Sequence, residues 1–353
     1  MTLNEKTKSV IYFGSYDPNY SRNRIIRKGL EANGVKVFTN QAKGIIFIRY
    51  FKLVLSFLKV QTKITAIIVG FPGHYDMPLA FILGKIFKKR VFYDIFASTY
   101  ETYVLDRKVV KEKSLRAKFF YLLDWVGLKL ADYVVVDTKA HGRFYQKLYG
   151  VDFKKTILVY VGSDTDYFYP RKTKETTDVL FYGSYQPLQG TDVIIKAAAI
   201  LPNVKFKMIG EGQEKALAES LAKNLKLKNV DFVDWLSLKN LAVEIRRAKI
   251  CLGIFGNSQK AKTVIPNKVY DYLATGKPVI TVDSVASREI LKNQETGTLV
   301  KPGEDVELAK QINRLIQDFK HAKIAAAKGY KLFTEKFRPI LVTRNLTSKI
   351  YEE

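Results

Sequence analysis

A lysine and an aspartate three residues apart form the pair in this sequence best suited to hold a phosphorylated ligand. Lys268 and Asp271 lie in the segment IPNKVYDYLATGKPVI, residues 265–280. Pro266 fits the first turn of a helix and Gly276 fits its C-terminal end, so both side chains are predicted to share a face near the helix N-terminus. Free N–H groups attract phosphate there, and a carboxylate accepts hydrogen bonds from both hydroxyls of a ribose. These features suit a sugar nucleotide, and the alternative is an ordinary surface Lys–Asp pair.

Two glycine-bearing loops are predicted to lie beside this helix. GSYQPLQG (183–190) follows one predicted strand, and IGEGQ (209–213) ends the next. Glycine lets the backbone approach a ligand closely, although strand-to-helix turns also use it for steric reasons alone. The carboxyl ends of parallel strands meet at one sheet edge, so we expect both loops and the helix to converge. The predicted nucleotide-sugar site contains Gly183, Ser184, Gln189, Gly190, Gly210, Glu211, Pro266, Asn267, Lys268 and Asp271.

Two residues in the first half are candidates for acid or base chemistry. His74 lies in the loop FPGHYD after a predicted strand, and Asp94 ends the predicted strand VFYD. Both follow carboxyl ends of strands, where a side chain can touch a sugar or act as a base. The alternative for each is a loop or helix cap.

Four charged residues of the first half are candidates for the acceptor or phosphate side. Arg22 and Arg24 follow Ser21, the expected helix N-cap, and cations in a first helical turn oppose the helix dipole. An anionic ligand would offset that cost, although two solvated arginines explain the pattern almost as well. Asp106 and Arg107 fit an acceptor-recognising pair or an ordinary surface ion pair.

The elements that position these residues alternate between strands and helices in two series. This alternation predicts two doubly wound parallel α/β sheets, separated by a polar linker at 170–178. The predicted domains are 1–170 on the acceptor side, 178–330 for nucleotide-sugar binding, and a segment 331–353 that packs back toward the first domain. The predicted strands are 10–13, 35–38, 66–69, 91–93, 133–136, 157–161, 179–182, 204–209, 230–233, 250–254, 279–282 and 298–300.

Length and composition indicate a two-domain cytosolic protein with an anionic partner. The chain has 353 residues, too many for one compact core, and its single cysteine excludes an internal disulfide framework. The first ten residues lack the apolar run of a secretory signal, and no stretch reaches the roughly 18 apolar residues of a membrane span. The net charge of +25 favours a phosphorylated ligand, an acidic membrane surface or nucleic acid.

The basic charge is concentrated around one predicted helix. No acidic residue occurs between Glu31 and Asp76, whereas six lysines and arginines do. Within 45–60, Arg49, Lys52 and Lys59 recur at helical spacing opposite a wide apolar face. This pattern is typical of a basic amphipathic helix on an anionic bilayer, and the alternative is a helix packed on its own sheet. Lys85, Lys88, Lys89 and Arg90 extend the basic surface.

The segments IPNKVYDYLATGKPVI, IGEGQ and VLFYGSYQPLQGTDVIIKAA resemble the donor domain of family 4 glycosyltransferases. The resemblance covers nearly the whole chain and is most specific over 179–300. It implies the two-domain GT-B fold and a retaining transfer from a nucleotide sugar, without a tightly held metal or cofactor. In that family a glutamate at the position of Asp271 holds the ribose, the proline-lysine segment lies beside the diphosphate, and the glycine loops approach phosphate and sugar.

Several positions depart from the family pattern. A second glutamate is common at the position of Thr263, and arginine and lysine are common near Ser184 and Gln189. A histidine is common at the position of Asp94. These departures leave donor identity open. The phosphate charge is then expected to rest on backbone N–H groups, Lys268 and Arg22 or Arg24.

The sequence thus predicts a glycosyltransferase that moves a sugar from a UDP-, GDP- or other nucleoside-diphosphate sugar to a lipid-linked or polysaccharide acceptor. We expect it to be peripheral at the inner membrane face. One alternative is a sugar-nucleotide epimerase of the same fold, which needs no acceptor. Another is a basic protein that binds nucleic acid or membrane, although no recognised nucleic-acid motif accompanies the charge.

Overall fold

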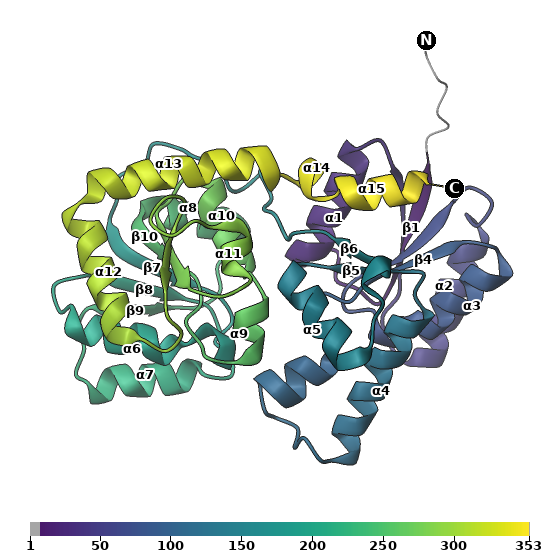
Figure 1. Cartoon of the computed structure of the whole chain (residues 1–353), viewed down its shortest axis with the longest axis horizontal. Helices are drawn as coiled ribbons and strands as arrows, with labels where there is room; N and C mark the ends of the chain where they lie inside the picture. The colour runs from purple at the N-terminus through teal and green to yellow at the C-terminus, as the bar shows by residue number, and fades with distance from the viewer. Residues whose placement is uncertain (1–7, 353) are drawn as a thin grey trace, which may run out of the picture. The chain divides into compact units, whose positions relative to one another are not determined.

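The computed structural model of the chain describes residues 8–352, which form two compact units (Figure 1). Most of the segment inspected for a signal sequence, residues 1–7, lies outside the described residues, as does residue 353. The first unit runs to Val161 and also includes residues from Pro339 onward, and the second unit is Gly162–Arg338.

The unit boundaries differ from the predicted linker at 170–178 for a packing reason. Phe168 is buried, and Arg246 donates a hydrogen bond to the carbonyl of Tyr167, so the chain is already part of the second unit there. At the other end, α13 (Phe319–Lys336) packs on α10 (Asn267–Ala274) within the second unit. The return to the first unit therefore begins at Pro339.

The first unit contains a six-stranded parallel sheet in the order β2-β1-β3-β4-β5-β6. The order changes direction between β1 and β3, and ligands of open α/β sheets bind beyond the carboxyl ends of strands at such a point. The strands are β1 (Ser9–Gly14), β2 (Lys36–Gln41), β3 (Ala66–Val69), β4 (Arg90–Asp94), β5 (Tyr133–Val136) and β6 (Thr156–Leu158).

Side chains of the first sheet alternate between two cores, one on each face. Ile11 and Phe13 of β1 belong to the core that also contains Leu53 and Phe57, whereas Tyr12 belongs to the opposite core. The helical elements are α1 (Ser21–Ala32), α2 (Ile46–Leu58), the 3₁₀ turn η1 (His74–Asp76), α3 (Met77–Ile86), the π-helix η2 (Glu101–Asp106), α4 (Leu115–Leu130), α5 (Lys139–Tyr149), the 3₁₀ turn η3 (Phe153–Lys155), α14 (Pro339–Val342) and α15 (Arg344–Tyr351).

The C-terminal segment completes the first unit by packing on α1. A Cβ added to Gly29 would lie 2.3 Å from the carbonyl oxygen of Pro339, so only glycine permits this approach. Asn33 Nδ2 donates to the carbonyl of Ile340 at 2.8 Å. Leu346 of α15 is fully buried in the core with β1.

The second unit contains the other parallel sheet, in the order β12-β11-β10-β7-β8-β9, with its change of direction between β10 and β7. Its strands are β7 (Thr177–Tyr182), β8 (Phe206–Ile209), β9 (Val230–Val233), β10 (Ala248–Leu252), β11 (Val279–Val282) and β12 (Thr298–Val300). Its remaining helical elements are the 3₁₀ turn η4 (Pro187–Gln189), α6 (Thr191–Ile200), α7 (Lys215–Asn224), α8 (Leu238–Arg247), α9 (Gln259–Thr263), α11 (Ser287–Ile290) and α12 (Asp305–Gln317).

The predicted fold class of two doubly wound parallel sheets is confirmed. Each predicted strand coincides with an observed one, with shifts of a few residues at the ends. The strand β2 continues to Gln41 beyond the predicted end at Phe38. The strand β6 ends at Leu158 instead of continuing to Val161, because its ladder with β5 stops at Val136.

Candidate functional site

Lys268 occupies the carboxyl edge of the second sheet, at the point where the strand order changes direction. It lies in the first turn of α10 and is 97% buried, since its relative exposure is 3%. Its Nζ donates to Gln189 Oε1 and to the carbonyl of Gly253, at 3.4 Å, after β10. The same Nζ lies 3.8 Å from the centroid of the Phe181 ring on β7. The predicted meeting of the α10 and 183–190 segments therefore takes place around this ammonium.

The Lys268 charge has no anionic partner among residues 8–352. Its contacts are a side-chain amide, a carbonyl and aromatic rings, and no described carboxylate forms an ion pair with it. Burial holds the pKa of Lys268 well below its usual range. A buried cation of this kind gains from an anion that brings its own charge into the site.

Asp271 is held by two hydroxyl groups of its own unit. One carboxylate oxygen accepts from Ser163 Oγ and the other from the hydroxyl of Tyr182. The residue is buried, and it lies one turn after Lys268. The role of Ser163 could not be predicted from a local pattern, because it lies 108 residues from Asp271 in the chain.

The glycines of the two loops are required by close packing. A Cβ at Gly210 would lie 2.0 Å from the carbonyl oxygen of Gly183, and φ at Gly210 is +132°. A Cβ at Gly183 would lie 2.7 Å from Lys268 Nζ. Gly190 has φ of +62° and touches the backbone of Gly256. The steric explanation left open by the sequence therefore accounts for Gly190 and Gly210, whereas Gly183 also leaves space for the ammonium.

The remaining predicted donor-side residues surround this centre less tightly. Ser184 is half-buried, and Pro266 and Asn267 are half-buried at the start of α10. Glu211 is exposed and pairs with Lys215, while its carbonyl accepts from Tyr185 N and joins the two loops.

Asp94 and Arg22 form a buried ion pair in the first unit. The Arg22 guanidinium contacts the Asp94 carboxylate at 3.0–3.2 Å through Nε and Nη2, and both side chains are fully buried. Arg22 Nη1 also donates to the carbonyl of Val159, at 2.5 Å. Burial raises the pKa of the Asp94 carboxyl, and Arg22 opposes this effect. This arrangement does not fit the predictions of Asp94 as a cleft-facing base or of Arg22 as a phosphate ligand, because each is committed to the other.

His74 is also buried, in η1 after β3. Its Nδ1 lies 2.6 Å from the Tyr93 hydroxyl and 3.4 Å from an Asp124 carboxylate oxygen. Its ring packs edge-on against Phe71, with centroids 6.0 Å apart. His74 therefore connects β4 and α4 as well as lying near the carboxyl end of β3.

The other predicted acceptor-side residues have local partners. Arg24 Nη1 donates to the carbonyl of Asn19 at 2.8 Å. Asp106 is buried at the end of η2, and the Arg107 guanidinium lies 5.5 Å from the Tyr103 ring.

A buried cluster in the first unit was not predicted. His141 of α5 lies between Asp137, 2.6 Å from Nδ1, and Glu101, 2.9 Å from Nε2. Burial opposes protonation of the ring, but the two carboxylates outweigh it and raise the pKa of His141 to about 9. The spacing of Asp137 and His141 after a strand was an available signal, whereas Glu101 is 40 residues away. In the described part of the chain, no group of His, Cys, Asp or Glu is arranged to hold a metal ion.

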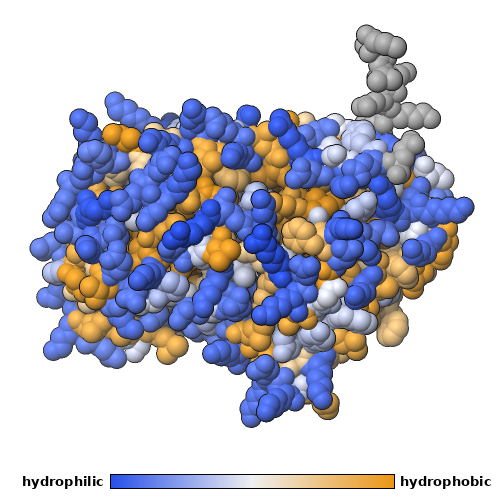
Figure 2. Space-filling model, in the orientation of Figure 1, coloured by the Kyte–Doolittle hydropathy of each residue, from blue (hydrophilic) through white to orange (hydrophobic). Residues whose placement is uncertain are grey.

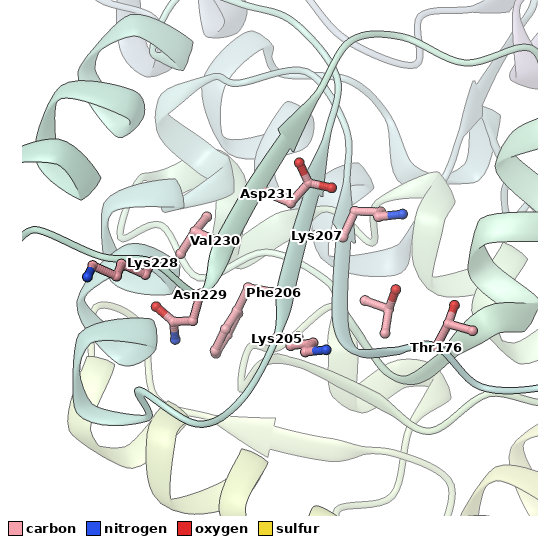
Figure 3. A pocket seen from close by; sticks show the side chains of 9 residues that line it. Thr176, Lys205, Phe206, Lys207, Lys228, Asn229, Val230 and Asp231 are labelled. Atoms are coloured by element: carbon pink, nitrogen blue, oxygen red, sulfur yellow. The ribbon is translucent and has the colours of Figure 1, made fainter.

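A cavity of about 520 Å³ lies at the opposite edge of the second sheet (Figure 3). It is lined by residues at the amino ends of β7, β8 and β9, including Lys205, Lys228 and Asp231. Lys207, another lining residue, is paired with Glu244 at 2.7 Å. Because ligands of such sheets bind beyond the carboxyl ends of strands, the Lys268 centre remains the better candidate despite this cavity.

Comparisons with known proteins give a family match for the second unit and structural neighbours for the whole chain. Residues 164–332 match the sequence profile of the family described as glycosyl transferases group 1. D-inositol 3-phosphate glycosyltransferase of Mycobacterium bovis is 27% identical over 203 residues, covering 53% of this chain and 41% of that protein. The match thus spans about two fifths of the length of this curated relative.

Solved structures share the fold over nearly the whole chain. The Anabaena protein HepE in complex with UDP and glucose has a TM-score of 0.73 at 16% identity, covering 99% of this chain and all of that one. Sucrose-phosphate synthase from Thermosynechococcus elongatus has a TM-score of 0.73 at 18% identity, covering 98% and 99%. At these identities the likeness establishes the fold alone. Residues 164–332, most of the second unit, thus match the glycosyl transferases group 1 family, and the chain as a whole has the GT-B fold.

Proposed function

We propose that this protein transfers a glycosyl group from a nucleoside-diphosphate sugar to a lipid-linked or polysaccharide acceptor. The observation that carries the proposal is Lys268, a buried cation without an anionic partner in the described residues, at the switch point of a group 1 domain. A diphosphate supplies the missing negative charge. HepE was crystallised with UDP and glucose, which supports a nucleotide sugar as the donor class.

In the proposed complex, Lys268 Nζ exchanges its bond to Gln189 for one to a diphosphate oxygen. The N–H groups at the start of α10 add partial positive charge near the same anion. Positive charge at the diphosphate stabilises the leaving group as the glycosidic bond breaks, which is the main catalytic contribution this centre offers. Retention of configuration is part of the proposal because it is the outcome that the family resemblance implies.

Asp271 is proposed to hold the ribose, and the neighbouring Ser163 and Tyr182 are proposed to position its carboxylate. Because Ser163 and Tyr182 donate to its two oxygens, they fix the position of the Asp271 carboxylate. The proposal no longer includes Asp94 as a base or Arg22 as a phosphate ligand, since they neutralise each other. His74 and Arg24 remain candidates for contacts on the acceptor side.

The proposal is tested by binding and by product. Purified protein is screened by thermal shift against UDP-, GDP-, ADP- and TDP-sugars, and the correct donor raises the unfolding midpoint by mass action. Incubation of that donor with membrane lipid extract or polysaccharide should then yield a glycosylated acceptor and free nucleoside diphosphate. Conversion of the donor into an isomeric nucleotide sugar without a glycosylated acceptor would instead indicate the epimerase.

A further inference from the structure

Helix α2 is apolar on two opposite faces, and only one of them is packed. Leu53 and Phe57 are fully buried against the first sheet. Phe47, Phe51 and Leu55, spaced four residues apart, form a stripe on another face and are 82%, 65% and 46% exposed. Ile48 and Leu58 widen this stripe and are exposed as well. An apolar outer face of this size on a helix at the surface is unusual for a protein that meets only water.

Helix α4 repeats the arrangement. Its inner face buries Ala117, Phe120 and Leu128. Leu115 and Phe119 lie on the outer face, 82% and 50% exposed, and Leu122 continues the stripe at 54%. The spacing of these three residues is i, i+4 and i+7, which places them along one line of the helix.

The two stripes are joined through η1. The Tyr50 hydroxyl of α2 donates to the carbonyl of Tyr75, and the Tyr75 ring lies 6.5 Å from the ring of Phe119 on α4. We call the exposed apolar residues of both stripes the two-helix apolar surface. Figure 2 shows apolar side chains along the edge of the first unit, over α2 and α3. The surface consists of Phe47, Ile48, Phe51, Leu55, Leu58, Leu115, Phe119 and Leu122.

Positive charge flanks this surface. Lys52 and Lys59 are exposed on α2, and Arg116 and Lys118 are exposed on α4. Arg49, which the sequence assigned to the same basic stripe, is instead turned toward the protein and pairs with Asp76 at 2.9 Å. The cationic contribution of α2 is therefore carried by its lysines.

We propose that the two-helix apolar surface inserts into the outer layer of an anionic lipid bilayer. Apolar side chains of both helices enter the acyl boundary while the flanking lysines and Arg116 contact anionic headgroups. A second copy of the chain fits less well, because both copies would bring the same positive charges together. Across the described residues no helix is long and apolar enough to cross a membrane. The inference rests on the proposed function, which includes a lipid-linked acceptor. It deepens that function by identifying the surface that meets the membrane.

The test measures partition of the full chain into vesicles of phosphatidylcholine alone or with phosphatidylglycerol. We expect binding to the anionic vesicles and partial retention at molar salt, because insertion persists when charge is screened. The pairs Phe47→Ser with Phe51→Ser, and Leu115→Ser with Phe119→Ser, should each lower the partition coefficient about tenfold or more. Lys52→Gln with Lys59→Gln should lower it about fivefold per charge on anionic vesicles.

The matched control is Leu217→Ser with Val306→Ser, two similarly exposed apolar residues of α7 and α12 in the second unit. This pair should leave partition within about twofold of wild type. Equal loss in the control, or unchanged binding in both stripe variants, would overturn the proposal. A lipid-free dimer that disappears in the stripe variants would also overturn it and identify a second copy as the occupant.

Fluorescence and donor binding separate this proposal from the proposed function. Trp125 of α4 is the single tryptophan left in Trp235→Phe, and its emission should shift to the blue on binding anionic vesicles. Nucleotide-sugar thermal shifts should be unchanged in the stripe variants. Vesicle binding without a thermal shift by any nucleotide sugar would refute the enzymatic proposal alone. A thermal shift by a nucleotide sugar without vesicle binding would refute the docking proposal alone.

Discussion

Replacing Lys268 by methionine should separate the stability of the second unit from its ability to bind donor. Methionine has a similar length and no charge, so it fills the space beside Phe181 without the cost of burying an ammonium. The change removes the bonds to Gln189 and Gly253, and each acceptor left unpaired costs about 1–3 kcal/mol. Methionine also removes the cost of burying the Lys268 ammonium, which stabilises the fold and offsets the lost bonds. We therefore expect the free energy of unfolding to change by only about 2 kcal/mol or less.

Donor affinity should respond very differently. A charge-assisted hydrogen bond contributes about 1.5–3 kcal/mol, so its loss should raise Kd between about 10-fold and 150-fold. The assay pairs urea unfolding of the free protein with calorimetric titration of the donor found by the thermal-shift screen. Lys196→Met is the matched control, because Lys196 lies on α6 in an exposed pair with Asp192 and should affect neither measurement.

The pH dependence of donor binding follows from the same residue. Because burial lowers the pKa of Lys268 in the free protein, a bound diphosphate should raise it again. At pH values between these two pKa values binding takes up a proton, and affinity falls as pH rises above the pKa of the free protein. Calorimetry in buffers of different ionisation enthalpy measures this uptake. A Kd within threefold of wild type for Lys268→Met would refute Lys268 as the diphosphate cation. Proton uptake on binding that is the same in wild type and in Lys268→Met at every pH would refute it as well.

Three further predictions concern the buried polar groups. Asp94→Asn should destabilise the first unit by about 3–5 kcal/mol, because it leaves Arg22 buried without its anion, and near-normal stability with lost activity would restore Asp94 as a catalytic candidate. Asp271→Ala should lower both donor affinity and the free energy of unfolding, the latter by about 2–4 kcal/mol, and Tyr182→Phe should lower the free energy of unfolding by less. Unchanged unfolding in urea would contradict the buried hydrogen bonds. For His141, the folded pKa of about 9 lies above the usual value, so its stabilisation is complete below about pH 6.5 and is lost as pH rises through 9. Urea unfolding at pH 6.5 and 9.5 should show a loss of about 3 kcal/mol that is absent in His141→Asn, and equal losses in both proteins would refute this assignment.

The strand positions and the fold class were predictable because they depend on local patterns. Apolar runs bounded by turn residues mark buried parallel strands, and alternation with helices fixes the doubly wound class. The place of Lys268 at the start of a helix was predictable for a related reason, since Pro266 and Gly276 are close to it in sequence.

The failures at the site have a common physical origin in pairing over long sequence distances. Arg22 was assessed alone as a phosphate ligand and Asp94 alone as a cleft-facing base, whereas they are 72 residues apart in sequence and pair with each other in the interior. The clash that requires glycine at 210 involves the backbone of Gly183, which no composition signal reveals. For α2 the stripe itself was visible, but which of its two apolar faces is packed depends on the position of the sheet.

The way in which the C-terminal segment closes the first unit has a consequence for synthesis on the ribosome. Although most of the first unit precedes the second unit in sequence, its α1 lacks the backbone of Pro339 and the buried Leu346 until the whole second unit has been translated. The second unit, contained within a single uninterrupted stretch, is the one that can complete its core first. During that interval the first unit exposes an apolar face that its own last residues will cover, so a nascent chain halted shortly before residue 339 should bind chaperones that the released protein does not.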